Sequence, residues 1–276
     1  MRFTKMHGAG NDYVYVDLFD EQVADAPALA RIVSDRNKGI GGDGLILLAP
    51  SEAGDVRMEM YNADGSRAQM CGNGVRCLAH LARDHGRVEG PVVRVETDDG
   101  IKVVELSEGA ARVDMGPPRL DPQALPVLIE GERVIEHTID VLDRTFAMTC
   151  VSMGNPHAVV YVDDVEQFDV ARYGAALEQG GLFPERTNVE FVQVIDREHV
   201  IQRTWERGSG ETLACGTGAC AVCVAGVVNG RTARTLHNRL LGGELLLEWP
   251  DDEASVIMTG PVATVFTGTM ELHGVR

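Results

Sequence analysis

The sequence predicts an α+β protein of two pseudo-symmetric lobes that arose by internal duplication. The first observation is a pair of near copies, MCGNG at 70–74 and ACGTG at 214–218, whose cysteines are 144 residues apart (215 − 71 = 144). The second is that the same spacing relates Asn11 to Asn155, each preceded by glycine. The third is that segments with alternating apolar residues, typical of strands, surround one helical segment in each copy.

Strands are expected where β-branched and other apolar residues alternate with polar ones. Turn signals such as the Asp-Asp-Gly string at 98–100 separate these segments. The expected strands are 13–17, 92–96, 101–106, 111–115, 158–162, 189–194, 244–249 and 254–258.

Two helices are expected, one after each Cys-Gly-x-Gly string. The first spans about 74–85, where Val75, Leu78 and Ala82 form an apolar stripe of helical period. The second spans about 218–229 and is apolar nearly all the way round, so it should be buried on every side. We therefore expect each lobe to be a β-barrel-like sheet wrapped around a central helix, with an active-site cleft between the lobes.

The expected boundary between the lobes is the string PPRLDP at 117–122, where regular structure should break. A further strand is expected over 262–272, after the second copy has ended. We expect it to return and complete the first lobe. The predicted lobes are therefore 1–117 with 262–276, and 118–261.

Composition excludes several classes of protein. The 276 residues carry a formal net charge of −17 and no basic stripe, which argues against binding to nucleic acid or to an anionic membrane. The longest apolar stretch, 219–228, is too short to span a bilayer, and the first residues carry no apolar signal segment. We expect a cytoplasmic protein whose six cysteines remain free rather than forming disulfides.

Each Cys-Gly-x-Gly string combines a thiol with the first turn of a helix. The exposed N–H groups of Gly72, Asn73, Gly216 and Thr217 can bind a carboxylate, and the helix dipole should lower the pKa of the adjacent thiol. One thiolate can remove a proton from an α-carbon while the other thiol delivers one to the opposite face. This chemistry inverts a stereocentre and needs no cofactor: no metal, no pyridoxal and no nucleotide.

The chain resembles the diaminopimelate epimerase family over essentially its whole length. The strings that carry the resemblance are KMHGAGNDYVYVD, YNADGS, AQMCGNGVRC, GNPHAVV, TNVEFV and WERGSGETLACGTGAC. The resemblance implies a cofactor-independent homodimer that interconverts LL- and meso-diaminopimelate in lysine and peptidoglycan precursor biosynthesis.

The resemblance also implies roles for individual residues. Cys71 and Cys215 match the acid–base pair, and His157 and Glu206 match groups that tune the pKa values of the thiols. The matched substrate ligands are Asn11, Asn62, Gly72, Asn73, Asn155, Asn188, Glu206, Arg207, Gly216 and Thr217. The charges of Glu206 and Arg207 suit the ammonium and the distal carboxylate of the substrate.

One position departs from the family pattern. Some members carry a substrate-contacting glutamine where this chain has Gly44, so any contact from this position would be made by the backbone. Its repeat mate is Asn188 (188 − 44 = 144).

Three alternative functions remain open from the residues alone. A redox or zinc-binding protein would use Cys71, Cys77, Cys215, Cys220 and Cys223, and a metal assay would identify it. A binding module would hold an anion on the glycine turns, but it leaves the paired thiols unexplained. A racemase for proline would share the paired thiols, whereas Arg207 favours a substrate with a second carboxylate.

Overall fold

The structure is a computed structural model that describes residues 1–271. The chain divides into two compact units. Unit 1 comprises Met1–Val113 together with the chain from Gly260 onward, and unit 2 comprises Asp114–Thr259. The end of the predicted first lobe, 272–276, lies outside the described residues. No helix within 1–271 is both long and apolar enough to cross a bilayer.

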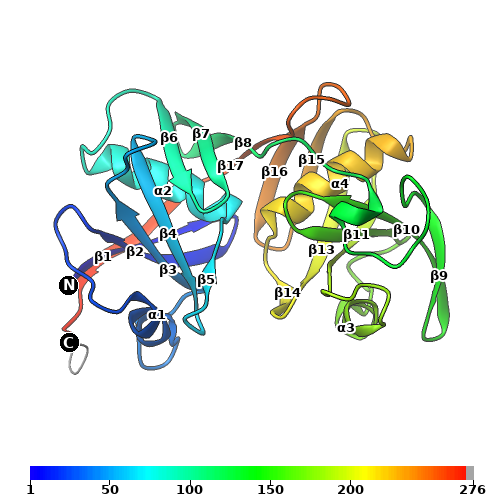
Figure 1. Cartoon of the computed structure of the whole chain (residues 1–276), viewed down its shortest axis with the longest axis horizontal. Helices are drawn as coiled ribbons and strands as arrows, with labels where there is room; N and C mark the ends of the chain where they lie inside the picture. Colours follow the sequence, from blue (N-terminus) through cyan, green and yellow to red (C-terminus); the bar gives the residue numbers. More distant parts are fainter. Residues whose placement is uncertain (272–276) are drawn as a thin grey trace. The chain divides into compact units, whose positions relative to one another are not determined.

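Unit 1 is a mixed sheet that curves around one helix (Figure 1). Its strands pair in the order β18, β1, β2, β3, β4, β6, β7, β8. The pairs β2–β3 and β4–β6 are parallel and the others antiparallel. The elements are β1 (Arg2–Gly8), β2 (Asn11–Asp17), α1 (Ala26–Ser34), β3 (Gly44–Ala49), β4 (Val56–Asn62), β5 (Arg67–Ala68), α2 (Gly72–Asp84), β6 (Val92–Thr97), β7 (Gly100–Ser107), β8 (Ala110–Asp114) and β18 (Ala263–Thr269).

Unit 2 repeats this arrangement. Its strands pair in the order β9, β10, β11, β12, β13, β15, β16, β17, with β11–β12 and β13–β15 parallel. The elements are a 3₁₀ turn (Pro122–Ala124), β9 (His137–Val141), β10 (Arg144–Ser152), β11 (Pro156–Tyr161), α3 (Val170–Gln179), β12 (Asn188–Val194), β13 (His199–Glu206), β14 (Gly210–Thr212), α4 (Gly216–Val228), β15 (Thr235–Leu240), β16 (Gly243–Glu248) and β17 (Ile257–Pro261).

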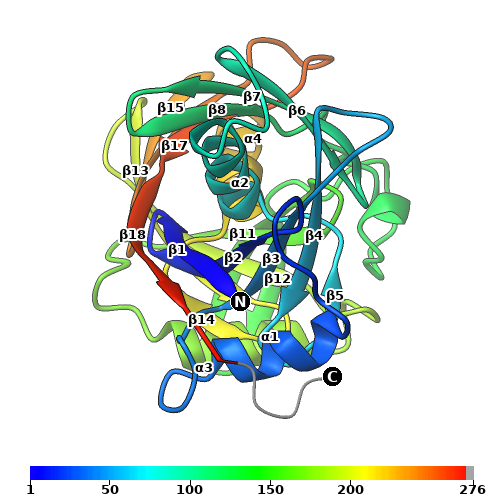
Figure 2. The same cartoon turned by 90° about the vertical axis from the view of Figure 1, so that its left-hand side faces the viewer.

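The two units therefore share one topology, and the predicted α+β class and duplication are confirmed. The helices α2 and α4 begin at Gly72 and Gly216, which keeps the spacing of 144 residues (216 − 72 = 144). The place that β9 takes beside β10 in unit 2 is taken in unit 1 by β18, which pairs antiparallel with β1. Figure 2 shows this last described strand lying along β1.

Each unit has a central helix with a different character. In both views α2 runs between β6–β8 and β1–β4 (Figures 1 and 2). Buried residues of α2 include the polar Arg76 and His80, whereas α4 is buried from Gly218 to Gly226 among apolar side chains. The prediction that the second helix is buried on every side is confirmed.

Both central helices begin two residues earlier than predicted. The reason is that Cys71 and Cys215 are themselves the N-cap residues, with extended backbone and a sulfur that accepts a hydrogen bond from the N–H of Gly74 or Gly218. The glycines of each Cys-Gly-x-Gly string therefore belong to the first helical turn.

The sequence analysis missed several elements. The helices α1 and α3 are short, and each is capped by an aspartate, Asp25 and Asp169, whose carboxylate accepts from the first turn. The strands not predicted are β1, β3, β4, β9, β10, β13 and β15, together with the short β5 and β14. The strand predicted at 254–258 lies instead at 257–261, because the chain turns at Asp251 and Val256 bonds to Gly116.

Candidate functional site

The first group of predicted site residues gathers around Cys71 in unit 1 and is called half-site 1. Cys71 caps α2 and Asn11 begins β2, so two different elements bring these side chains together. The Cys71 thiol donates to Asn11 Oδ1 at 3.3 Å. Asn73 Nδ2 approaches the same oxygen at 3.4 Å.

Two further residues fix the polar groups of half-site 1. The Asn11 amide donates from Nδ2 to Asp43 Oδ2 at 2.7 Å. The guanidinium of Arg76, which is fully buried in α2, donates to Asn73 Oδ1 at 2.8 Å and to the Gly72 carbonyl at 3.3 Å. The first turn of α2 is therefore held from inside the unit.

The strand β4 contributes Asn62, which donates from Nδ2 to Ser66 Oγ at 3.0 Å. Its cross-strand neighbour is Gly44. A Cβ atom at Gly44 would lie 2.2 Å from the Tyr61 carbonyl oxygen, so only glycine fits on this backbone. The departure noted in the sequence thus permits a close approach of β3 to β4.

The second group, called half-site 2, gathers around Cys215 in unit 2. The Cys215 sulfur accepts from the Gly218 N–H at 3.4 Å and lies 3.5 Å from Thr217 Oγ1. Asn155 Nδ2 donates to the same Thr217 oxygen at 3.3 Å. The predicted residues Gly216 and Thr217 form the first turn of α4, as Gly72 and Asn73 do in α2.

Behind Asn155 lies a fully buried pair of ionisable groups. His157 Nε2 is 3.0 Å from Asn155 Oδ1, and His157 Nδ1 is 2.8 Å from Glu190 Oε1. Neither His157 nor Glu190 is exposed to solvent. A Cβ atom at Gly218 would lie 2.5 Å from Glu190 Oε1, so the carboxylate packs directly against the start of α4.

The remaining predicted residues of unit 2 lie at the ends of β12 and β13. Asn188 accepts the backbone N–H of Arg207 at 2.9 Å and donates to the Pro156 carbonyl at 3.0 Å. The Arg207 side chain is exposed and donates to the Glu185 carbonyl at 3.1 Å. Glu206 accepts from the hydroxyl of Thr212. Asn188 thus links the two strand ends that carry Glu206 and Arg207.

The surroundings of Cys215 raise the pKa of its thiol well above the usual value. Burial is the largest cause, followed by the nearby carboxylates of Glu206 and Glu190. Hydrogen bonds from Thr217 and from the Gly218 N–H act in the opposite direction. The expectation that the helix terminus lowers the pKa of this thiol is therefore wrong for Cys215, because the cost of burying a thiolate exceeds the stabilisation from the helix.

The other four cysteines are not among the predicted site residues. Cys77, Cys150, Cys220 and Cys223 are fully buried, and burial raises the pKa of Cys77 and of Cys223 to about 12. A metal could be held by His157, Glu190 and Cys215, whose donor atoms lie within 4.8 Å of one another. This set contains one cysteine of the five on which the zinc alternative depends.

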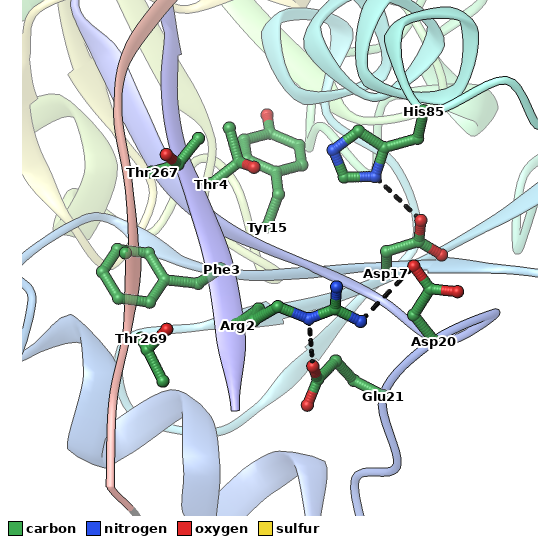
Figure 3. Close-up of a pocket in the computed structure, with 11 residues that line it drawn as sticks. Arg2, Phe3, Thr4, Tyr15, Asp17, Asp20, Glu21, His85, Thr267 and Thr269 are labelled. Carbon is green, nitrogen blue, oxygen red and sulfur yellow. Dashed lines mark hydrogen bonds and ion pairs between the residues drawn. The ribbon is translucent and has the colours of Figure 1, made fainter.

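Unit 1 also has a pocket of about 310 Å³ that contains no predicted site residue (Figure 3). Charged side chains line one part of it, where His85 Nδ1 and Asp17 Oδ2 are 2.8 Å apart and Arg2 Nε and Glu21 Oε1 are also 2.8 Å apart. Strand β18 contributes Thr267 and Thr269 to its wall. Its charges are already paired with one another.

Three residues with direct contacts to the predicted sites were missed by the sequence analysis. Asp43 lies in a glycine-rich loop string, and Arg76 lies two residues after the second glycine of the cysteine turn. Glu190 is the single charged residue in the apolar string that forms β12. A charge within a buried strand or helix is a sequence signal that could have identified Arg76 and Glu190.

Comparison with known proteins gives closely similar sequences. The family model described as diaminopimelate epimerase matches residues 3–120 and 149–265. The chain is 51% identical over 278 residues to the diaminopimelate epimerase of Acetivibrio thermocellus, with 99% of each chain covered. It is 47% identical to that of Leptospira biflexa, again with 99% of each covered. It is 46% identical to that of Methanococcus maripaludis, with 99% of this chain and 100% of the relative covered.

Solved structures with the same fold are much less similar in sequence. A phenazine biosynthesis protein of the PhzF family from Bacillus anthracis has a TM-score of 0.71 at 14% identity and covers 99% of both chains. A probable proline racemase from Agrobacterium radiobacter has a TM-score of 0.67 at 15% identity, with 99% of this chain and 93% of that chain covered. These likenesses establish the fold alone.

Proposed function

The chain belongs to the diaminopimelate epimerase family, and on this premise we propose that it interconverts LL- and meso-diaminopimelate without a cofactor. The activity is that of an isomerase. The observation that carries the proposal is the pair of cysteines that cap equivalent helices, each with an asparagine of the repeat in its half-site.

In the proposed reaction Cys71 and Cys215 act on opposite faces of the α-carbon. One sulfur, as thiolate, takes the α-proton, and the electron pair of the C–H bond moves into the substrate carboxylate to give a planar enediolate. The other thiol then gives its proton to the opposite face, which forms the new C–H bond and leaves a thiolate there. Each turnover exchanges the roles of the two sulfurs.

The helix termini supply the stabilisation that this intermediate needs. N–H groups of Gly72, Asn73, Gly216 and Thr217 bind the α-carboxylate, on which negative charge accumulates in the transition state. Because the donors are fixed by the helices, they need little reorganisation as the charge develops. His157 and Glu206 adjust the pKa values of the thiols in this proposal.

The remaining ligands hold the distal end of the substrate. Arg207 binds the distal carboxylate and Glu206 binds an ammonium group, as their charges require. Asn11, Asn62, Asn155 and Asn188 donate and accept hydrogen bonds around the substrate. A substrate with two amino-acid ends fits this set better than proline does, because proline has no distal carboxylate.

We further propose that the protein is a homodimer of the cytoplasm that serves lysine and peptidoglycan precursor synthesis. The apolar side chains of Val265 and Phe266 on β18 are 54% and 46% exposed, which supports burial of this strand against a second copy. Light scattering of the purified protein, with F266E as the variant, tests this. A monomeric wild-type protein would contradict the homodimer.

The test of the activity is incubation of the purified protein with LL-diaminopimelate in deuterium oxide without added cofactor. We expect meso product, with early label in the product stereoisomer and little in recovered substrate, since each face has its own thiol. C71A and C215A should each lower kcat by at least about a thousandfold while the circular dichroism stays unchanged.

Three results would argue against the proposal. Near-normal turnover in either cysteine variant contradicts the two-base assignment. Equal early label in substrate and product indicates a single base that serves both faces. Activity that is lost on treatment with a chelator would favour the metal alternative.

A further inference from the structure

We propose that two carboxylates outside the predicted site, Asp43 and Glu190, are positioning residues that turn the paired asparagines in opposite senses. Asn11 is turned so that its oxygen faces Cys71, and the repeat mate of this asparagine is turned so that its NH₂ group faces the other thiol through Thr217. The inference rests on the proposed function only for the acid and base roles of the thiols.

In unit 1 the orientation follows from the chemistry of a carboxylate, which accepts hydrogen bonds and cannot donate them. Asp43 Oδ2 accepts from Asn11 Nδ2 at 2.7 Å and from the Asp12 N–H at 3.1 Å. The Asn11 NH₂ group must therefore face Asp43, and its Oδ1 faces the Cys71 sulfur at 3.3 Å. An acceptor oxygen at this place stabilises the protonated thiol.

In unit 2 the equivalent amide is reversed. Asn155 Oδ1 faces His157 Nε2 at 3.0 Å, and Asn155 Nδ2 donates to Thr217 Oγ1 at 3.3 Å. Since Thr217 Oγ1 accepts from Asn155, the hydroxyl hydrogen is available for the Cys215 sulfur 3.5 Å away. The result is a series of donors that ends at the sulfur and stabilises its thiolate.

Glu190 is the residue that maintains this orientation of the Asn155 amide. For Asn155 Oδ1 to accept, His157 must carry its hydrogen on Nε2, which leaves Nδ1 to share a proton with Glu190 Oε1 at 2.8 Å. Both groups are completely buried, so water does not compete for this contact. Without Glu190 the imidazole hydrogen can move to Nδ1, and Asn155 is free to turn.

Unit 1 lacks such a pair at the equivalent positions. The repeat spacing places Tyr13 where unit 2 has His157 (157 − 144 = 13) and Ile46 where it has Glu190 (190 − 144 = 46). The packing confirms the second equivalence, because a Cβ atom at Gly74 would meet Ile46, as one at Gly218 would meet Glu190. The two units therefore differ at their thiols: an acceptor oxygen faces Cys71, whereas a donor hydroxyl faces Cys215.

The series of donors that ends at Thr217 also offsets part of the free-energy cost of burying a thiolate at Cys215. The groups that raise the pKa of this thiol are its buried surroundings and the carboxylates of Glu206 and Glu190, and the groups that lower it are the Thr217 hydroxyl and the Gly218 N–H. Orienting Asn155 keeps the Thr217 hydroxyl directed at the sulfur. In the proposed reaction this hydrogen bond stabilises the Cys215 thiolate, so that it can form during each cycle.

The experiment measures each thiol separately in the substrate-free, full-length protein. Methyl methanethiosulfonate, a small uncharged reagent, is applied between pH 6 and pH 11, and mass spectrometry gives the modification rate of the Cys71 and Cys215 peptides. E190I introduces the residue that unit 1 carries at this position. E190Q removes the charge, but its amide can still donate to His157 Nδ1 and keep the hydrogen on Nε2.

We expect E190I to raise the midpoint pH of Cys215 modification by about one unit. At a given pH below the midpoint, this shift makes the reaction about tenfold slower. E190Q should leave that midpoint unchanged or lower it, and Cys71 should be unaffected in both. If Glu190 acted only as a nearby negative charge, E190I and E190Q would lower the midpoint equally. That result, or no change in E190I, overturns the proposal.

The second arm concerns the other thiol and does not depend on the first. D43N gives Asn11 a partner that can accept or donate, so Asn11 can turn its NH₂ group to Cys71. We expect the midpoint of Cys71 modification to fall by about one unit, with Cys215 unchanged. D55N, which removes an exposed carboxylate of the same unit, is the matched control. Equal effects of D43N and D55N overturn the assignment of Asp43.

Thermal unfolding checks that each variant is folded. If E190I does not fold, T217V removes the last donor of the series and should raise the Cys215 midpoint in the same way. An unchanged midpoint in T217V overturns the proposal for unit 2. Because the measurement uses no substrate, it is independent of the proposed activity, whose failure would be a wild-type protein that does not epimerise diaminopimelate.

Discussion

At the scale of the residue, the two cysteines have the same backbone role and different neighbours. Both cap a helix and accept from the third residue after them. Cys71 faces the oxygen of Asn11, whereas Cys215 faces the hydroxyl of Thr217 and lies close to Glu206 and Glu190. A reaction that uses two thiols in alternation does not require them to be identical, only that each can hold and release a proton.

The exposed guanidinium of Arg207 gives a prediction at this scale. R207K should raise KM for diaminopimelate by roughly tenfold with a smaller effect on kcat, because an ammonium group cannot form the paired hydrogen bonds of a guanidinium with a carboxylate. R186K is the matched control, since Arg186 adjoins Glu185, whose carbonyl contacts Arg207, and pairs with Glu178. An unchanged KM in R207K would place Arg207 outside the substrate site. Initial-rate kinetics provide the measurement.

At the scale of the element, capping residues decide where the helices begin. The glycines at the start of α2 and α4 have low helix propensity, yet both belong to the first turn because the preceding sulfur accepts an N–H. The helices α1 and α3 depend on aspartate caps of the ordinary kind. Of these four helices, the sequence analysis identified the two that carry the repeated cysteine string.

The cap of α1 provides a second prediction. D25A should lower the free energy of unfolding by about 1 kcal/mol, because it removes the carboxylate that accepts from the Ala28 N–H at 2.9 Å. D25S restores an acceptor and should recover most of the loss. Urea denaturation measures both variants. A loss that serine does not recover would mean that Asp25 stabilises the protein by some contact other than the cap.

At the scale of the whole molecule, both units hold buried thiols outside the two half-sites. Burial raises the pKa of Cys77 in unit 1 and of Cys223 in unit 2 from an ordinary value of 9.0 to about 12. Above pH 9 the unfolded chain loses these protons while the folded protein retains them. The stability that they provide is therefore complete below pH 9 and is lost as the pH rises toward 12.

Alkaline denaturation tests this relation. The free energy of unfolding should fall between pH 9 and pH 11 by about 1.4 kcal/mol per pH unit for each buried thiol, in addition to the contributions of other groups. In the C77A, C223A double variant the slope should be flatter by that amount per thiol. The comparison of slopes cancels any constant cost of the smaller side chains. Equal slopes would show that the two thiols are not buried as described.

Much of the fold was predictable because the sequence contains an internal repeat. The common spacing identified both central helices, and their apolar surfaces predicted that strands surround them. Some missed strands lack alternation, as in β3 with its run of buried apolar residues, and some pair with strands distant in sequence, as β1 does with β18. Strand pairing depends on contacts that only the folded chain provides, so a local pattern does not specify it.

The sequence by itself determined the duplication, the α+β class and the family, because these depend on motifs and spacing that the residue order states. Only the tertiary structure brought Asp43 to Asn11 and Glu190 to His157, and only it raised the pKa of Cys215 above its ordinary value. The reason is physical. Burial and hydrogen-bond direction are properties of residues that meet across strands and helices, and they set the protonation of a thiol more strongly than its position in a motif does.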